Sequence, residues 1–197
     1  MNEFETKRMP ADPTTIALVD AWRTPAARDF FRNVWPIYVH EISGFDTDFY
    51  VLDETGRWLP NVVDTWLSSA TPQQHLGVST SEHAPAQPCQ RAHVITSDGR
   101  PVGFICIGMQ PFKYMPDDAD LSIAEFFLIH ASRGTGAGTR ALELLLLRYP
   151  GRWHLRAIHD NARAIRFWRK ALPAAGVRDI EERSEDRDVV FRFVAGG

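Results

Sequence analysis

The chain is poor in cysteine and has no long apolar segment. Its only cysteines, Cys89 and Cys106, are too far apart in the sequence to form a metal-binding pair, which indicates a reducing environment. The first residues, MNEFETKRMPADPTT, lack the apolar core of a secretory signal. The longest apolar run, ALELLLLRY from Ala141, contains Glu143 and is far shorter than the ~20 residues that a membrane span needs. We therefore expect a cytoplasmic protein without membrane embedding.

An excess of basic residues is also missing. The 22 lysines and arginines are balanced by 25 aspartates and glutamates, and the formal net charge is -3. A generic nucleic-acid binder is basic, so we expect no nucleic-acid partner. With 44% hydrophobic and 24% charged residues, the composition is typical of globular proteins. The length of 197 residues predicts a single domain, which we place over residues 14–197. We expect residues 1–13 to form a flexible N-terminus.

The first half of the chain predicts one strand and two helices. The stretch TTIALV is typical of a strand. Residues 24–42, TPAARDFFRNVWPIYVHEI, place Thr24 as N-cap ahead of a proline at the first helical position, so they predict a helix that Pro36 kinks or splits. Residues 59–76 predict a second helix, and the polar, proline-containing residues 77–90 predict a loop.

The second half alternates strands and helices more regularly. The stretch RAHVITSDGRPVGFICIG has two β-rich runs around Asp98-Gly99, a dipeptide that tolerates the positive φ of a tight turn, and so predicts a hairpin. The later elements are predicted in the following order: a buried strand over residues 120–130, a glycine-rich loop and helix over 132–151, a strand over 152–158, a helix over 161–172 and a closing hairpin over 177–194.

The segment SRGTGAGTRALELLLLRYPG, from Ser132, places three glycines ahead of an apolar helix. Glycines at a helix start usually serve an anionic ligand, because the first N–H groups of a helix have no intrahelical partner. A nucleotide P-loop is excluded, because Gly138 is followed by Thr139 and Arg140 where that motif needs a lysine.

A dinucleotide-binding loop is a second interpretation of these glycines. Residues 136–141, GAGTRA, satisfy the Gly-x-Gly-x-x-Gly/Ala form, and Asp160 follows roughly 20 residues later. However, the loop from His130 to Thr135 separates the strand from the glycines, whereas a dinucleotide fold needs the turn directly after the strand. A dinucleotide-binding enzyme therefore stays as an alternative.

A third interpretation rests on residues 133–138, RGTGAG, which have the form Arg-x-x-Gly-x-Gly between an apolar strand and a helix. This segment resembles the acetyl-CoA-binding signature of the GNAT superfamily of N-acetyltransferases. The stretch NARAIRFWRKAL resembles a later helix of that superfamily, in which an asparagine, here Asn161, precedes an aromatic pair, here Phe167 and Trp168. The resemblance covers residues 91–195, and the blocks AEFFLI, PGRWHLRAI and AIRFWRK are similar to a group of predicted bacterial acetyltransferases.

The resemblance implies an α/β (α+β) fold: a mixed, mostly antiparallel central sheet, flanked by helices and splayed between the cofactor strand and the next strand. It implies an acceptor-side half over residues 14–90 and an acetyl-CoA-binding half over residues 91–197. The implied reaction moves an acetyl group from acetyl-CoA, a co-substrate, to a primary amine of a small molecule or peptide by direct attack on the thioester. The sequence leaves open whether the acyl group is longer than acetyl. Members of the superfamily are often homodimers, and we extend that expectation to this chain.

The same resemblance implies the site residues. Glu125, alone among the apolar residues of SIAEFFLI, matches a position that often carries an acidic group beside the acceptor; it would take a proton from the amine or pair with a neighbouring arginine. The Leu128 backbone N–H matches the hydrogen-bond donor to the thioester carbonyl. Many members place a tyrosine, the acid for the departing thiolate, where this chain has Trp168, so a non-catalytic acyl-CoA-binding module is a further alternative. The residues implied to bind acetyl-CoA are Leu128, Ile129, His130, Arg133, Gly134, Thr135, Gly136, Ala137, Gly138, Thr139, Asn161 and Phe167.

Other polar residues give weaker predictions. His83, Cys89 and His93 fit no tight ligand spacing, so we expect no metal site. Four basic residues of the later helix are expected to face either the adenosine phosphates or solvent. They are Arg163, Arg166, Arg169 and Lys170.

Overall fold

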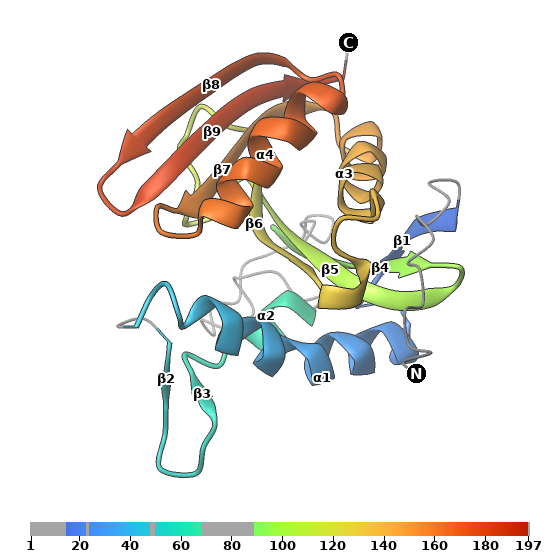
Figure 1. Cartoon of the computed structure of the whole chain (residues 1–197), viewed down its shortest axis with the longest axis vertical. Coiled ribbons are helices and arrows are strands. Elements are labelled where there is room, and N and C mark those ends of the chain that lie inside the picture. Colours follow the sequence, from blue (N-terminus) through green and yellow to red (C-terminus); the bar gives the residue numbers. More distant parts are fainter. Residues whose placement is uncertain (1–14, 23, 48–49, 68–88, 197) are drawn as a thin grey trace, which may run out of the picture.

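A seven-stranded sheet forms the centre of the fold (Figure 1). The computed structural model describes residues 15–22, 24–47, 50–67 and 89–196. The strands are β1 (Ile16–Asp20), β4 (Gln90–Ser97), β5 (Arg100–Met109), β6 (Leu121–Leu128), β7 (Gly151–Ile158), β8 (Arg178–Glu185) and β9 (Asp188–Ala195). They lie in the order β1-β4-β5-β6-β7-β9-β8, and every neighbouring pair is antiparallel except β6 and β7. The predicted mixed, mostly antiparallel sheet is therefore confirmed.

Helices cover both faces of this sheet. Helices α3 (Ala137–Arg148) and α4 (Ala162–Ala174) lie on one face, and α1 (Pro25–Ile42) with the short α2 (Val63–Leu67) lies on the other (Figure 1). Each face has its own apolar core, one containing Leu142, Leu145 and Trp153, and the other containing Phe31 and Phe104. The site described below lies where the strands between these two cores separate.

Helix α1 follows its predicted bounds but differs in two details. Thr24 is the N-cap, yet its side chain does not cap the helix; its hydroxyl donates to the Asp20 carbonyl oxygen at 3.0 Å. Pro36 lies inside the helix without splitting it. Since Pro36 is exposed, the carbonyl of Arg32, four residues earlier, can be hydrated on the outer side of the helix, and the lost hydrogen bond does not end it.

A small hairpin precedes α2, and α2 is shorter than the helix that the sequence predicted over residues 59–76. Strands β2 (Val51–Leu52) and β3 (Trp58–Leu59) pair with each other and project from the body of the molecule (Figure 1). The turn is held by Asp53, whose carboxylate accepts hydrogen bonds from the backbone N–H groups of Thr55 and Arg57. Residues 68–76 of the predicted helix lie outside the described residues, as do the predicted flexible N-terminus, residues 1–13, and residues 77–88 of the predicted loop.

The predicted hairpin around Asp98-Gly99 is confirmed. Its strands are β4 and β5, and the two turn residues have positive φ values of 50° and 74°. A tight hairpin turn needs this conformation, which Asp and Gly tolerate. The strands and helices predicted after residue 120 are likewise present as β6, α3, β7, α4, β8 and β9.

Strands β6 and β7 separate part-way along their length. They pair in parallel over only three residues of each strand, ending at Ile123 and Leu155, although each strand has eight residues. Beyond Ile123 the edge of β6 that faces β7 is not paired with it. This is the splay that the sequence resemblance implied.

A bulge in β6 decides which side chains face which core. Cys106 of β5 pairs with Glu125 and Ile107 pairs with Ile123, so Ala124 has no counterpart. Because side chains alternate along a strand, one extra residue reverses the alternation. Ile123 therefore packs in the core under α3 and α4, while Glu125 reaches a side chain of α1 on the opposite face.

Among the described helices, none combines the length and apolarity needed to cross a bilayer.

Candidate active site

Glu125 lies on β6 beside the separation of β6 and β7. Its carboxylate accepts a hydrogen bond from the Tyr38 hydroxyl of α1. The alternative prediction, an ion pair with a neighbouring arginine, is not what the structure shows: among the described residues, no basic side chain forms an ion pair with Glu125. The carboxylate is held by a neutral donor and is not neutralised by a cation.

Burial raises the pKa of Glu125 to about 7, and the hydrogen bond from Tyr38 opposes this rise. Burial also raises the pKa of the Tyr38 phenol, so this residue remains a protonated donor throughout the neutral range. Cys106, which pairs with Glu125 across β5, has its pKa raised by burial and by the nearby carboxylate. A carboxyl group that titrates near neutral pH is suited to accept and release a proton.

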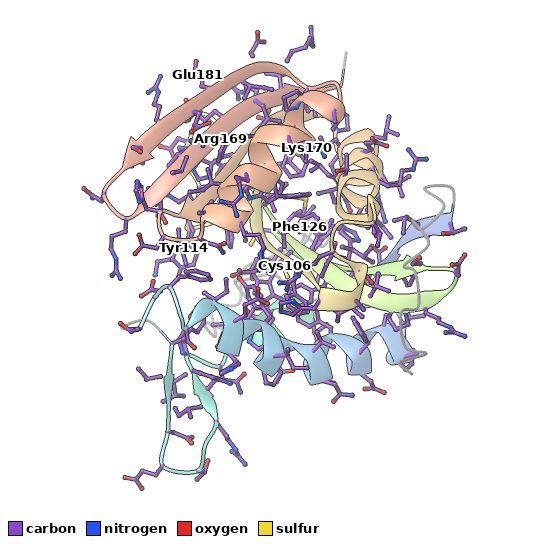
Figure 2. All side chains as sticks on the ribbon, in the orientation of Figure 1. Cys106, Tyr114, Phe126, Arg169, Lys170 and Glu181 are labelled. Atoms are coloured by element: carbon purple, nitrogen blue, oxygen red, sulfur yellow. The ribbon has the colours of Figure 1, made fainter. Side chains whose placement is uncertain are left out.

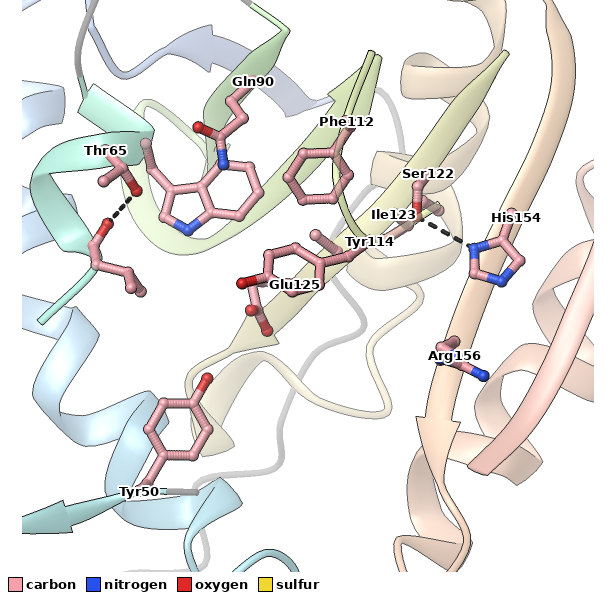
Figure 3. Close-up of a pocket in the computed structure, with 13 residues that line it drawn as sticks. Tyr50, Thr65, Gln90, Phe112, Tyr114, Ser122, Ile123, Glu125, His154 and Arg156 are labelled. Atoms are coloured by element: carbon pink, nitrogen blue, oxygen red, sulfur yellow. Dashed lines mark hydrogen bonds between the residues drawn. The ribbon is translucent and has the colours of Figure 1, made fainter. Parts of the chain in front are cut away.

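Glu125 lines a cavity of about 380 Å³ (Figure 3). The carboxylate and the Tyr50 ring point into this space, and Phe112 and Tyr114 lie along another side of it. Residues from the acceptor-side half and from both separating strands form the wall. The lining residues are Tyr50, Val62, Thr65, Trp66, Gln90, Phe112, Tyr114, Ser122, Ile123, Ala124, Glu125, His154 and Arg156.

The Leu128 backbone N–H points away from β5, toward the separation. Leu128 pairs with Gly103, and the next N–H along β6, that of Ile129, donates to the Val102 carbonyl at 2.9 Å. In an antiparallel ladder the N–H groups of successive residues point to opposite edges. The polar backbone groups of Leu128 therefore face the β7 side, where its carbonyl accepts a hydrogen bond from Arg133 Nε at 2.7 Å.

Arg133 connects the glycine-rich loop to α1. Its two terminal nitrogens donate to the two carboxylate oxygens of Glu41 at 2.7 and 2.6 Å. These hydrogen bonds lower the pKa of Glu41, and the guanidinium also lies over the Phe127 ring at 5.5 Å. The sequence resemblance implied that Arg133 binds acetyl-CoA. In the structure its charge is already matched by Glu41, so its described contacts fix the position of the loop.

The glycine-rich loop leaves open space at the start of α3. Gly134 and Gly136 have positive φ values of 76° and 90°, and a Cβ on either would meet no atom within 4 Å. Gly136 is the N-cap of α3, and the first helical hydrogen bond runs from the Arg140 N–H to its carbonyl at 3.0 Å. Thr135 holds the loop by donating to the Ser132 carbonyl at 2.9 Å. The Ala137 N–H donates to the Thr135 hydroxyl oxygen at 3.4 Å, whereas the N–H groups of Gly138 and Thr139, in the first turn of α3, can serve an anion in this open space.

Phe167 of α4 packs beside this loop. A Cβ on Gly138 would lie 3.1 Å from the Phe167 ring and 3.2 Å from the Leu128 side chain, so any side chain there would press against both. The Phe167 ring also lies 5.3 Å from that of Phe126. Asn161 caps α4 by accepting a hydrogen bond from the Ala164 N–H at 3.1 Å.

Comparison with known proteins identifies the family of this chain. A sequence model described as the acetyltransferase (GNAT) family matches residues 60–172, which is more than half of the chain. The chain belongs to this family. No curated protein matches it significantly.

Solved structures share the GNAT fold. An acetyltransferase from Thermus thermophilus is 18% identical, with a TM-score of 0.56, over 90% of this chain and 96% of that one. RimL, a ribosomal L7/L12 alpha-N-protein acetyltransferase, is 12% identical, with a TM-score of 0.50, over 91% of this chain and 89% of that one. At these identities the likeness shows the fold alone.

Two groups of residues that the sequence singled out have other partners in this member of the GNAT family: the basic residues of α4 and the candidate metal ligands. Arg169 of α4 donates to Glu182 of β8 at distances of 2.6–3.1 Å, which ties α4 to the outer hairpin that also carries Glu181 (Figure 2). His93 is buried between Asp20, at 2.8 Å, and Tyr149, at 3.1 Å. Within the residues that the structure describes, no group of three or more His, Cys, Asp or Glu side chains is placed to hold a metal ion. His83 lies outside the described residues.

The remaining predicted residues lie around the loop. Ile129 precedes the 3-10 turn His130–Ser132, and the His130 side chain is exposed, 4.0 Å from Glu41. Trp168 is buried, with its ring 5.3 Å from Phe126, on the face of the sheet opposite Glu125.

Sequence reasoning missed Tyr38, Glu41, Tyr50 and the pair formed by Ser122 and His154. Tyr38 and Glu41 lie three residues apart on α1, which places both on the face toward the site. That spacing was readable, but their partners on β6 and in the loop are 87 and 92 residues away in the chain. No local pattern predicts such contacts.

Proposed function

We propose that the protein is an acetyl-CoA-dependent N-acetyltransferase that acetylates a primary amine, with Glu125 as the general base. The observation that carries the proposal is the Glu125 carboxylate, which lies in a cavity at the separation of β6 and β7 and has a pKa of about 7. Membership of the GNAT family supports acyl transfer as the reaction class.

The residues around the glycine-rich loop fit an acyl-CoA. The open space at Gly134 and Gly136, with the N–H groups that begin α3, suits the negatively charged pyrophosphate. The edge of β6 beyond Ile123 is not paired with β7 and presents the Leu128 N–H, which suits an extended chain of amide groups such as pantetheine. The co-substrate supplies an acetyl group activated as a thioester.

Glu125 takes the proton that must leave the amine. An alkyl ammonium has a pKa of about 10, so the acceptor arrives protonated and cannot attack. The Glu125 carboxylate accepts this proton directly or through one water, which frees the nitrogen lone pair. The new C–N bond then forms as the C–S bond breaks, and the second proton that the nitrogen loses passes through water to the departing thiolate, which leaves as the thiol.

The Leu128 N–H supports the same step. It points toward the separation, where it would donate a hydrogen bond to the thioester carbonyl oxygen as negative charge develops there. Arg133 holds the Leu128 carbonyl and thereby fixes the end of the strand. Trp168 takes no part as an acid, because it is buried in the other core and an indole only donates hydrogen bonds.

Thiol release tests this function against a non-catalytic acyl-CoA-binding module. The purified protein is mixed with acetyl-CoA and a panel of primary amines, and the free thiol is measured. We expect thiol release only when an amine is present. We also expect calorimetry to detect binding of CoA. CoA binding without release would support the binding module, and binding of NAD in place of CoA would support the dinucleotide alternative.

Assembly and cellular location are extensions of the same proposal. We propose a homodimer in the cytoplasm, on the basis of the family resemblance and of the sequence features discussed above. Light scattering at high micromolar concentration gives the mass, and a monomer would contradict the proposed dimer.

A further inference from the structure

The cavity beside Glu125 has one negative group among its described lining residues. That group is Glu125 itself, which the proposed function uses for the reacting amine. A polycationic acceptor, such as a polyamine or an aminoglycoside, needs further carboxylates to hold its remaining ammonium groups, because each desolvated charge must be paired. The described part of the cavity wall provides no second one.

The cationic side chain among the described lining residues, Arg156, already forms ion pairs. Arg156, on β7, pairs with Glu185 at 2.9 Å and with Asp188 at 3.4 Å. His154, also on β7, is neutral at physiological pH because burial lowers its pKa to about 4. An acceptor that carries a carboxylate therefore finds no unmatched cation among the described lining residues.

Aromatic rings form one continuous side of the cavity. The rings of Trp66 and Phe112 are 5.9 Å apart, and those of Phe112 and Tyr114 are 5.5 Å apart in an edge-to-face arrangement. Phe112 lies directly over Gly108 of β5, where any Cβ would collide with its ring. Tyr50 and Tyr114 point toward the same space as the Glu125 carboxylate (Figure 3). Such a wall favours a flat, apolar body next to the amine.

The polar side chains that remain are neutral. Ser122 and His154 face each other at 3.4 Å across the parallel pair of strands, and Thr65 donates to the Val62 carbonyl at 2.6 Å. They offer hydrogen bonds to a hydroxyl or ring N–H at the far end of a ligand, but no charge. The volume of about 380 Å³ lies at the small end of ligand-binding pockets.

We propose that the acetyl acceptor is a small aromatic monoamine of the arylalkylamine type, which carries neither a carboxylate nor a second ammonium group. The inference rests on the proposed function, since it assigns Glu125 to the reacting amine. The ammonium lies at Glu125, and the aromatic body packs against Trp66, Phe112 and Tyr114.

Matched pairs of amines test the class. Thiol release is compared for tryptamine against tryptophan, for hexylamine against 1,6-diaminohexane, and for phenethylamine against spermidine, kanamycin and a short peptide with N-terminal phenylalanine. We expect kcat/KM to be at least about tenfold higher for the aromatic monoamines, the scale of one unpaired charge or lost ring contact. A preference for spermidine, kanamycin, an amino acid or the peptide would overturn the inference and leave the acetyltransferase function standing.

If no amine releases thiol, the proposed function fails, and binding still tests the cavity. Calorimetry then compares tryptamine, spermidine and tryptophan on the CoA-loaded protein. Selective binding of tryptamine would then support only the preference of the cavity for an aromatic monoamine, whereas equal or no binding of the three would contradict that preference.

Two variants test whether residues of the cavity wall determine the preference among amines. Because Tyr114 is 65% exposed, we expect Tyr114→Ala to fold and to raise KM for tryptamine about threefold to tenfold, whereas Tyr114→Phe keeps the ring and should recover most of that loss. Thr65→Asp adds a carboxylate to the exposed rim of the cavity and is expected to shift the preference from hexylamine toward 1,6-diaminohexane. Unchanged amine selectivity in both variants would contradict the placement of the acceptor in this cavity.

Discussion

Two residues, Glu125 and Tyr38, carry the proposed chemistry of the site. A carboxylate on a strand otherwise composed of apolar and small residues is costly to bury unless it is hydrogen bonded or opens onto a polar site. Here it does both, since Tyr38 donates to it and it lines the cavity. Burial still outweighs that hydrogen bond and leaves the pKa of Glu125 near 7.

Removing the Tyr38 hydroxyl changes the acidity of Glu125. The hydrogen bond lowers the pKa of the carboxyl group, so Tyr38→Phe is expected to raise it by about one unit. The acid limb of the kcat/KM profile should then move to higher pH by the same amount. Tyr114→Phe, which removes a hydroxyl at the cavity wall without a described bond to Glu125, is the matched control and should leave the limb in place. An unmoved limb in Tyr38→Phe would contradict the role of this hydrogen bond.

The same burial predicts a stability cost that depends on pH. The pKa of Glu125 is raised in the folded protein from its ordinary value of 4.5, so the folded state binds more protons than the unfolded state between about pH 4.5 and 7. Its contribution to stability therefore falls as pH rises through that window, by roughly 1.4 kcal/mol per unit.

Glu125→Gln is expected to remove this cost. Its melting temperature should exceed that of the wild type at pH 8, and the difference should shrink toward pH 4.5, as thermal unfolding at both values would show. A variant that is less stable at pH 8 would instead indicate that Glu125 is a structural anchor.

At the scale of elements, the pair formed by Arg133 and Glu41 holds α1 against the glycine-rich loop. Its side chains are 21% and 32% exposed, whereas those of the Arg32–Asp64 pair on the outer surface are 46% and 70% exposed. Less exposed pairs are less screened by solvent. We expect a double-mutant cycle in urea to give a coupling of about 1 kcal/mol for Arg133 with Glu41 and close to zero for Arg32 with Asp64. Equal couplings would contradict the structural role of the inner pair.

Local patterns in the sequence predicted most of the elements, but not how distant ones meet. The dipeptide Asp98-Gly99 specified its hairpin because turn geometry is local. Strands β6 and β7 followed from apolar runs, and β8 and β9 from two alternating runs around a polar turn. The bulge at Ala124 was not predictable, because it depends on register with β5. The β2–β3 hairpin was missed although its turn is formed by local bonds to Asp53.

In the candidate site too, local sequence features were predictable and contacts between distant residues were not. Glu125 and the glycines were found because their residue types are unusual in their local setting. The hydrogen bond from Tyr38 and the partner of Arg133 required α1 to be placed against β6, which is a tertiary contact. The expectation that Arg133 binds acetyl-CoA did not anticipate that its guanidinium pairs with Glu41.

For the molecule as a whole, two buried histidines predict sensitivity to acid. Burial lowers the pKa of His93 and of His154 to about 4 in the folded protein, against 6.5 when exposed. Below pH 6.5 the unfolded state binds protons that the folded state does not, so stability is lost as pH falls from 6.5 to 4. Two histidines outweigh the opposite trend from Glu125. The free energy of unfolding in urea should therefore be lower at pH 5 than at pH 7, and His154→Gln should reduce that difference; a pH-independent value would contradict it.

The most direct test of the account is the turnover of Glu125→Gln across pH, with the amine that releases thiol fastest. As a general base, Glu125 predicts that the variant binds CoA with unchanged affinity, that kcat at pH 7.5 falls by about 100-fold or more, and that the loss shrinks above the pKa of the amine. The wild-type rate should show an acid limb near pH 7 that the variant lacks. Wild-type turnover by a folded Glu125→Gln protein at pH 7.5 would contradict the assignment.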